Sequence, residues 1–314
     1  MGKSIQGAGG ALVFGAVFHA IAARSELTET MRDMWPEKWL HSAITELQSV
    51  FVSFAGSMLV SVLLGLIDEE TGFVYFINAE HPYPILFRDQ KAQLILPDES
   101  LFKLGVVQSM VGRSLVNTLQ LQKGDVLLIG SDGKDDVVVN DNDNSNEKNN
   151  DESLILKYVT KAEGDCSKVY EMMNKELEFI DDFSLLSIYF SPYEEYLPPV
   201  LKTDTIKNLW KKGDYKILSS ILASHIEKSP GDLQSIMQAS QTFRKLGDFK
   251  QSIDLGERVR LRNRQSVANL VNLAQAYIMA ENPERSLMII DEALALDPNH
   301  RTALAVKEQL RAKV

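Results

Sequence analysis

The sequence predicts a protein of two domains, an α+β domain of layered sheets and helices followed by an all-α array of helical repeats. Its 314 residues suit two domains of ordinary size, and a content of 45% hydrophobic and 24% charged residues excludes a disordered chain. Helical patterns precede and follow a run of strand patterns, which favours an α+β layered arrangement. Acidic residues outnumber basic ones two to one up to Pro198, whereas basic residues are in excess after it. The uneven charge also indicates two parts.

The chain begins with two predicted helices. The first contains the apolar run Ala11 to Ala23, and the second opens at Pro36 and carries apolar residues at helical spacing. A secretory signal is the alternative for the first run, because Lys3 precedes it; since no clear cleavage site follows, we expect a buried helix instead. A run of about 13 residues is too short to cross a bilayer. We therefore expect no membrane span and a cytoplasmic protein.

Antiparallel hairpins are predicted between the two helical parts, because short apolar runs alternate there with turn residues. Two helices, at residues 153–160 and 166–178, are expected before the last strand. Asn140 to Glu152 contains no apolar residue and is expected to form a flexible surface loop. The strands are expected at Met58 to Ile67, Phe73 to Asn78, Pro84 to Phe87, Gln93 to Leu96, Ser114 to Leu121, Asp125 to Gly130 and Phe183 to Phe190.

The composition restricts the chemistry that the chain can perform. Cys166 is the single cysteine, so the sequence offers neither an internal disulfide nor a thiolate zinc site. The five histidines have no metal-ligand spacing, so a bound metal would need oxygen ligands. The acidic excess of the first part argues against nucleic-acid binding there.

Two acidic turns adjoin apolar strands. Ser131-Asp132-Gly133 follows one strand, and Asp181-Asp182 precedes another. Such turns are usually structural. Because each adjoins a rigid strand end, neighbouring strands could bring the carboxylates together, and clustered carboxylates suit Mg²⁺ or Mn²⁺.

Five motifs in order carry a resemblance to a known family. They are Met1-Gly2-Lys3-Ser4-Ile5-Gln6-Gly7-Ala8, Gly72 with Asn78-Ala79-Glu80-His81-Pro82, Leu104-Gly105-Val106, Lys123-Gly124-Asp125 with Ser131-Asp132-Gly133, and Asp181-Asp182-Phe183-Ser184-Leu185. Together they resemble the PPM-type (type 2C) protein serine/threonine phosphatases, and more narrowly the stage II sporulation protein E branch, over residues 1–191.

The resemblance implies an αββα sandwich that holds two Mg²⁺ or Mn²⁺ ions and hydrolyses phosphoserine or phosphothreonine with a metal-bound water. By motif position, Asp132 and Asp181 would be metal ligands, and Asp182 would organise its turn. Asp136 matches an acidic position of uncertain role. Asn78 and His81 match a motif that we interpret as a structural corner, so no side chain is assigned as catalytic base or nucleophile. The implied substrate is a phosphorylated signalling protein, such as an anti-sigma-factor antagonist.

The chain departs from the family pattern in its metal ligands and glycines. Further acidic ligands of the family would lie before Met1, and Glu80 and Ser4 stand where glycine is usual. Two carboxylates hold two hard cations weakly, and missing strands would leave open sheet edges. Two interpretations follow: a fragment or misplaced start of an active phosphatase, which we favour and which would show little activity alone, or a non-catalytic pseudophosphatase scaffold.

A repeat of 34 residues follows a proline-rich segment. Gly213-Asp214-Tyr215 recurs as Gly247-Asp248-Phe249 and then as Glu281-Asn282-Pro283. Period and apolar positions resemble about three tetratricopeptide repeats, whose implied function is to bind a protein partner in a groove. Arg258, Arg260, Arg262 and Arg264 form a basic cluster, either for an acidic partner or as a solvated helix end. The predicted domains are 1–191 (phosphatase-like), 192–199 (linker) and 200–314 (repeats).

Overall fold

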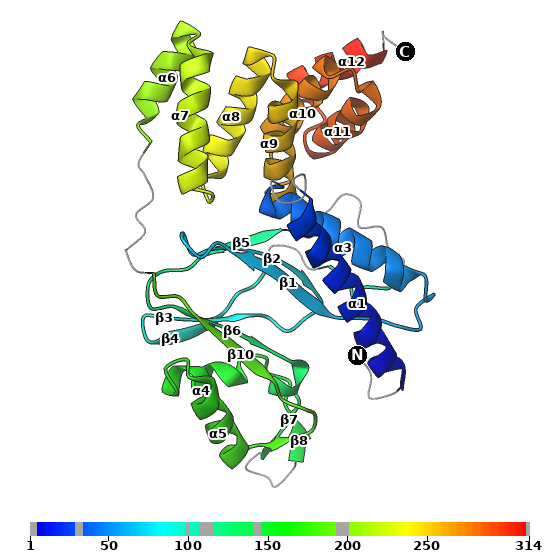
Figure 1. The fold of residues 1–314 in the computed structure, drawn as a ribbon, viewed down its shortest axis with the longest axis vertical. Helices are drawn as coiled ribbons and strands as arrows, with labels where there is room; N and C mark the ends of the chain where they lie inside the picture. The colour runs from blue at the N-terminus through cyan, green and yellow to red at the C-terminus, as the bar shows by residue number, and fades with distance from the viewer. Residues whose placement is uncertain are drawn as a thin grey trace. The chain divides into compact units, whose positions relative to one another are not determined.

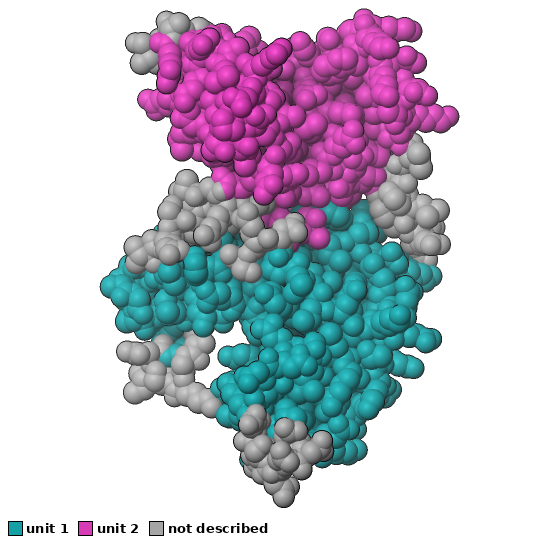
Figure 2. All heavy atoms as spheres, turned by 180° about the vertical axis from the view of Figure 1, so that it is seen from behind, with its two compact units in different colours: residues 1–21, 44–108, 119–196 teal, residues 22–43, 109–118, 197–314 magenta. Residues whose placement is uncertain are grey.

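A computed structural model describes residues 5–28, 34–97, 101–106, 116–140, 146–192 and 201–311. The chain divides into two compact units, coloured in Figure 2. Unit 1 comprises residues 1–21, 44–108 and 119–196, and unit 2 comprises residues 22–43, 109–118 and 197–314. The predicted class is confirmed: antiparallel sheets with helices are followed by an all-α repeat region (Figure 1).

Unit 1 contains two sheets that pack face to face. Val74 and Phe76 from one sheet and Leu86 and Leu127 from the other belong to one buried apolar cluster. The first sheet has the order β1-β2-β5 and the second the order β10-β6-β3-β4. Their strands are β1 (Val62–Ile67), β2 (Phe73–Ala79), β3 (Ile85–Arg88), β4 (Lys91–Leu94), β5 (Asn117–Gln120), β6 (Val126–Gly130) and β10 (Leu185–Tyr189).

Two helices cover the outer face of the second sheet (Figure 1). These are α4 (Leu154–Lys161) and α5 (Cys166–Glu176), and the wholly buried Tyr158 and Met173 pack with Ile85 and Leu128 of the sheet. Helix α4 has a buried apolar face because Ile155, Tyr158 and Val159 recur at helical spacing. This packing fixes the strands whose ends carry the acidic turns.

A third, small sheet was not predicted. It has the order β8-β7-β9, formed by β7 (Val137–Asn140), β8 (Asn146–Lys148) and β9 (Glu178–Phe179). The expectation of a structureless loop is therefore wrong for Asn146–Lys148. Pairing with β7 satisfies the backbone hydrogen bonds of this polar segment without any apolar side chain of its own.

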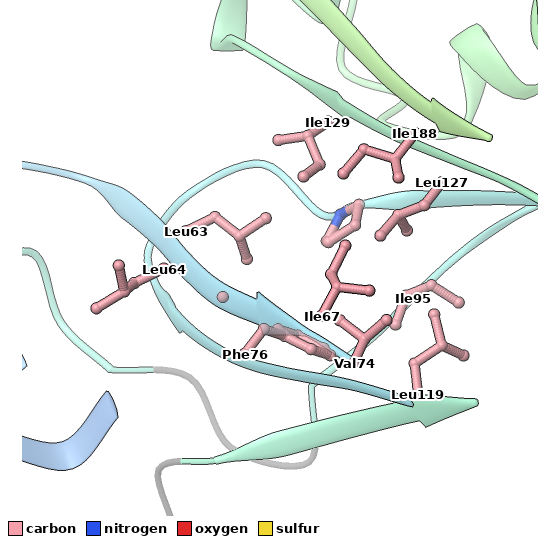
Figure 3. Close-up of a pocket in the computed structure, with 12 residues that line it drawn as sticks. Leu63, Leu64, Ile67, Val74, Phe76, Ile95, Leu119, Leu127, Ile129 and Ile188 are labelled. Carbon is pink, nitrogen blue, oxygen red and sulfur yellow. The ribbon is translucent and has the colours of Figure 1, made fainter. Parts of the chain in front are cut away.

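An apolar cavity of about 270 Å³ lies between the two large sheets (Figure 3). Its walls come from both sheets, and side chains such as Leu63 from one sheet and Ile129 and Ile188 from the other point into the space between them. Several of the lining residues are only half-buried, so the core of the sandwich is incompletely filled. The lining residues are Leu63, Leu64, Gly65, Ile67, Val74, Phe76, Pro84, Ile95, Leu119, Leu127, Ile129 and Ile188.

The first helix, α1 (Ile5–Leu27), is longer and more exposed than the sequence predicts. Residues 7–27 have the length and composition of a membrane-spanning helix, although a core helix or a signal sequence passes the same test, and 11% of the most apolar window is buried. The expected length was too short because it counted only the uninterrupted apolar run. Within the described residues, the expectation of a buried helix is wrong, and the expected lack of a membrane span stays a prediction.

Unit 2 consists mainly of paired helices. The second helices of successive pairs begin at Tyr215, Phe249 and Pro283, at the predicted interval. Gly213 and Gly247 end the first helices with φ of 77° and 82°, which favour glycine. The pairs are α6 (Thr203–Lys212) with α7 (Tyr215–Lys228), α8 (Leu233–Leu246) with α9 (Phe249–Arg262), and α10 (Val267–Met279) with α11 (Pro283–Leu296), followed by α12 (Arg301–Arg311). Most of the predicted linker lies outside the described residues.

Unit 2 also contains the start of α3 (Pro36–Val52), far from the repeats in sequence. The wholly buried Glu37 accepts a hydrogen bond from Arg258 Nε at 2.8 Å. The guanidinium of Arg258 lies over the ring of Trp35, 4.5 Å from its centroid. Removing one partner of a buried ion pair costs about 3–5 kcal/mol, so the described residues around Trp35 and Glu37 are an integral part of this unit.

Candidate functional site

The two predicted acidic turns lie at adjoining strand ends. Strands β6 and β10 pair so that Gly130 faces Leu185, and the turns leave the sheet at this point. Ser131 N–H donates to Ser184 O at 2.9 Å, and Ser184 N–H donates to Ser131 Oγ at 3.0 Å. Ser131 Oγ also donates to Asp182 O at 3.2 Å. The prediction that these two turns are neighbours is therefore confirmed. The assignment of Asp132 and Asp181 as metal ligands stays a prediction.

Gly133 is required by the close approach of these turns. A Cβ at this position would lie 2.2 Å from Asp182 O and 2.7 Å from its carbonyl carbon. Both atoms are backbone, which cannot move aside as the end of a side chain can. The glycine after Asp132 therefore sets the separation of the two acidic segments.

The carboxylates of the two turns differ in their surroundings. Asp132 and Asp182 are exposed, whereas Asp181 is half-buried. Asp181 Oδ1 accepts a hydrogen bond from Asp182 N–H at 2.7 Å. The predicted turn-organising role of Asp182 therefore belongs to its backbone, together with the side chain of Asp181.

Two lysines beside Asp132 were missed by the sequence analysis. Lys134, only 1% exposed, binds Asp135 at 2.5 Å, and Lys148 binds Asp136 at 2.7 Å. Burial raises the pKa of Asp135, although the lysine opposes this. The two acids that follow the Asp132 turn are therefore charge-compensated by the chain itself. Only the charged residue directly after Asp132-Gly133 could have signalled this from the sequence.

Asn78 and His81 form the structural corner that the sequence predicts. Asn78 Nδ2 donates to His81 O at 2.9 Å, and His81 N–H donates to Asn78 Oδ1 at 2.8 Å. Burial lowers the pKa of His81. The nearby Lys134 lowers this pKa further, whereas Asp132 raises it. Glu80, which replaces the glycine of the motif, adopts a φ of 46°, in the left-handed region.

Asp125 of the Lys123-Gly124-Asp125 motif has a structural role. Its buried carboxylate accepts from Arg88 Nε at 3.0 Å and from Arg88 Nη2 at 2.5 Å. This bidentate pair ties the end of β3 to the start of β6. The carboxylate of Asp125 is therefore already paired with an arginine of the chain.

The donors at the turns fit a hard cation in kind but do not complete a two-ion site. Carboxylate oxygens are suitable ligands for Mg²⁺ and Mn²⁺. The described residues, however, contain no group of three or more His, Cys, Asp or Glu side chains that could hold a metal ion. Asp132 and Asp181 alone leave most positions around two ions without a protein ligand.

The antiparallel sandwich and its two acidic turns agree with what the sequence motifs led us to expect, and the comparison with protein families gives the same result. The model of the stage II sporulation protein E family matches residues 1–191. The chain therefore belongs to this family, and the predicted resemblance is confirmed.

The chain is also similar to several solved structures. The RsbU and RsbW domains of Rv1364c from Mycobacterium tuberculosis have 15% sequence identity and a TM-score of 0.47, covering 73% of this chain and 59% of that one. The Arabidopsis OM64 TPR domain has 15% identity and a TM-score of 0.34, covering 35% of this chain and 92% of that one. The second TPR domain of human RPAP3, solved with an HSP70 peptide, has 11% identity and a TM-score of 0.33, covering 34% and 90%. No curated protein matches the chain.

Proposed function

We propose that residues 1–191 form a protein serine/threonine phosphatase domain, and that the repeats bind a protein partner or substrate. The observation that carries the proposal is the hydrogen-bonded junction of the Ser131–Gly133 and Asp181–Ser184 turns at the ends of β6 and β10. Membership of the stage II sporulation protein E family supports it. The substrate would be a phosphorylated signalling protein of the cytoplasm, and the family favours an anti-sigma-factor antagonist.

In this proposal Asp132 and Asp181 supply oxygen ligands to Mg²⁺ or Mn²⁺. The cation, when bound, provides a water of lowered pKa and neutralises phosphate charge. The chain's own contribution is positional: Gly133 allows the two turns to meet, and Ser131 bonds them together. Burial lowers the pKa of His81, which favours its neutral form, and its backbone bonds fix the neighbouring corner.

Two observations favour a second function, a scaffold that binds phosphoproteins without hydrolysing them. The described residues offer no group of three metal-ligating side chains, and Lys134 and Lys148 already neutralise Asp135 and Asp136. Such a domain would bind a phosphopeptide in its folded state and release no phosphate.

Phosphate release from a phosphoserine peptide by the full chain, with and without Mn²⁺, tests both functions. A phosphatase releases phosphate with Mn²⁺, and Asp132→Asn and Asp181→Asn each abolish this release. Asp182→Asn is the matched control, because its exposed side chain makes none of the junction's bonds. Phosphopeptide binding without release at any Mn²⁺ concentration, both by this chain and by a form extended with its upstream coding sequence, would instead establish the scaffold. Release that survives both substitutions would refute the assigned site.

A further inference from the structure

The first helices of successive repeat pairs lie side by side and form a layer, and two of these helices lack acidic residues. Helix α8 packs beside α10, and α10 beside α12. Helix α8 carries no acidic residue, and α10 carries no charged residue of either sign. Their polar side chains are mostly amides and hydroxyls. Neither of these two helices therefore provides a carboxylate that could balance a cation.

Arg244 places a cation in this layer. It is half-buried on α8, and its Nε donates to Asn272 Oδ1 on α10 at 2.7 Å. Asn272 Nδ2 in turn donates to the wholly buried Ser240 Oγ at 2.8 Å. Burial lowers the pKa of Arg244, and no neighbouring charge contributes to the shift. The hydrogen-bonded chain fixes the guanidinium between two helices.

Carboxylates compensate the other buried and half-buried arginines of the repeats. The basic cluster of the sequence analysis is therefore neither a solvated helix end nor a free surface for an acidic partner, because its members bind acids of this chain. By contrast, the described residues provide no carboxylate for Arg244, whose hydrogen-bond acceptor among them is the uncharged amide oxygen of Asn272. The compensated pairs are Arg258 and Arg262 with Glu37, Arg260 with Glu257 and Glu292, Arg264 with Glu292, and Arg285 with Glu257.

The free hydrogen-bonding groups of Arg244 define the chemistry of a ligand. With Nε held by Asn272, the two terminal nitrogens remain as a pair of donors whose geometry matches a carboxylate. Gln241 lies one turn before Arg244, and Gln275 lies one turn after Asn272, so their amides share the same helix faces. Amide side chains offer both donors and acceptors, which suits the backbone of a peptide.

We propose that Arg244, held by Asn272, is a subsite for a carboxylate side chain of an acidic peptide segment in a protein partner. This assignment rests on the proposed partner-binding function of the repeats and specifies its chemistry. The missing counter-charge is then supplied by the partner, as Glu37, Glu257 and Glu292 supply it elsewhere in the unit.

A library of 12-residue peptides, with Glu or Gln fixed at each position in turn, tests the subsite on the full chain. We expect the tightest binders to require one acidic position, where Glu→Gln weakens binding about tenfold or more, as for a hydrogen bond to a charged group. Arg244→Gln should reduce that Glu-to-Gln preference to about one, since glutamine can still donate to Asn272 but lacks the charge. Lys245→Gln, at the exposed neighbour, should leave the preference unchanged, and circular dichroism checks that both variants are folded.

The other outcomes overturn the inference in distinguishable ways. Tight peptide binding with no acidic preference, or a preference that survives Arg244→Gln, would refute the subsite and leave partner binding intact. Tighter binding of phosphoserine peptides or of a single-stranded oligonucleotide than of the Glu peptides would refute the carboxylate assignment. Failure of the wild-type chain to bind any peptide would refute both the subsite and the partner-binding function.

Discussion

Replacing Gly133 by alanine tests whether the approach of the two acidic turns is a fixed part of the fold. The added Cβ would lie 2.2 Å from Asp182 O, so the turns must separate or the backbone must distort. Overpacking of this kind costs about 1–3 kcal/mol. A loss of that size raises the population of the opened junction about 5- to 140-fold, since 1.4 kcal/mol corresponds to a factor of ten.

Hydrogen exchange followed by mass spectrometry measures this opening locally. The amides of Ser131 and Ser184 join the two turns, so peptides that cover residues 126–137 and 181–190 should exchange faster by that factor in Gly133→Ala. Gly15→Ala is the matched control: apart from the neighbouring residues and backbone of its own helix, no described atom lies within 4 Å of its new Cβ, and the helix should gain about 0.5–1 kcal/mol. Exchange in Gly133→Ala within twofold of the wild type would refute the steric argument.

Three further predictions concern stability. Asp125→Asn should destabilise unit 1 by about 3 kcal/mol, because Arg88 loses its charged bidentate partner. Urea unfolding followed by circular dichroism measures this change in the free energy of unfolding, and a change below about 1 kcal/mol would contradict the prediction. Burial lowers the pKa of His41, so the unfolded state binds more protons below pH 6.5 and unit 2 should lose stability as pH falls from 7 to 5. Thermal unfolding at several pH values measures this loss. If His41→Gln shows the same dependence of melting temperature on pH, His41 is not its cause. Ile188→Phe should fill part of the cavity between the sheets and stabilise unit 1 by about 0.5–2 kcal/mol; a lower melting temperature would show that the cavity cannot accept the ring.

The parts of the site that could be predicted are those with a local pattern. Apolar strands followed by acidic turns indicated where Asp132 and Asp181 lie, because a strand end positions the residue beside it. The pairing of β6 with β10 then joined the two turns. The repeat period likewise located the helix pairs, since each pair repeats the same local contacts.

The missed features depend on contacts between residues far apart in sequence. Glu37 and Arg258 are separated by 221 positions, and no periodicity connects them. Lys148 reaches Asp136 from β8, a strand that has no apolar pattern. The missing counter-charge of Arg244 could be recognised only after the partners of the other arginines were known.

The ion pair between Glu37 and Arg258 also bears on how the protein can be dissected. A fragment that starts at residue 200 keeps helices α6 to α12 but removes Trp35 and Glu37, which cover the Arg258 guanidinium. In that fragment the guanidinium of Arg258, and the surface against which Trp35 packs, would be exposed to solvent, whereas both are buried in the whole molecule. Adding a peptide of residues 22–43 back to it should restore the covered state, so an apparent interaction of the isolated repeats could belong to their own missing piece.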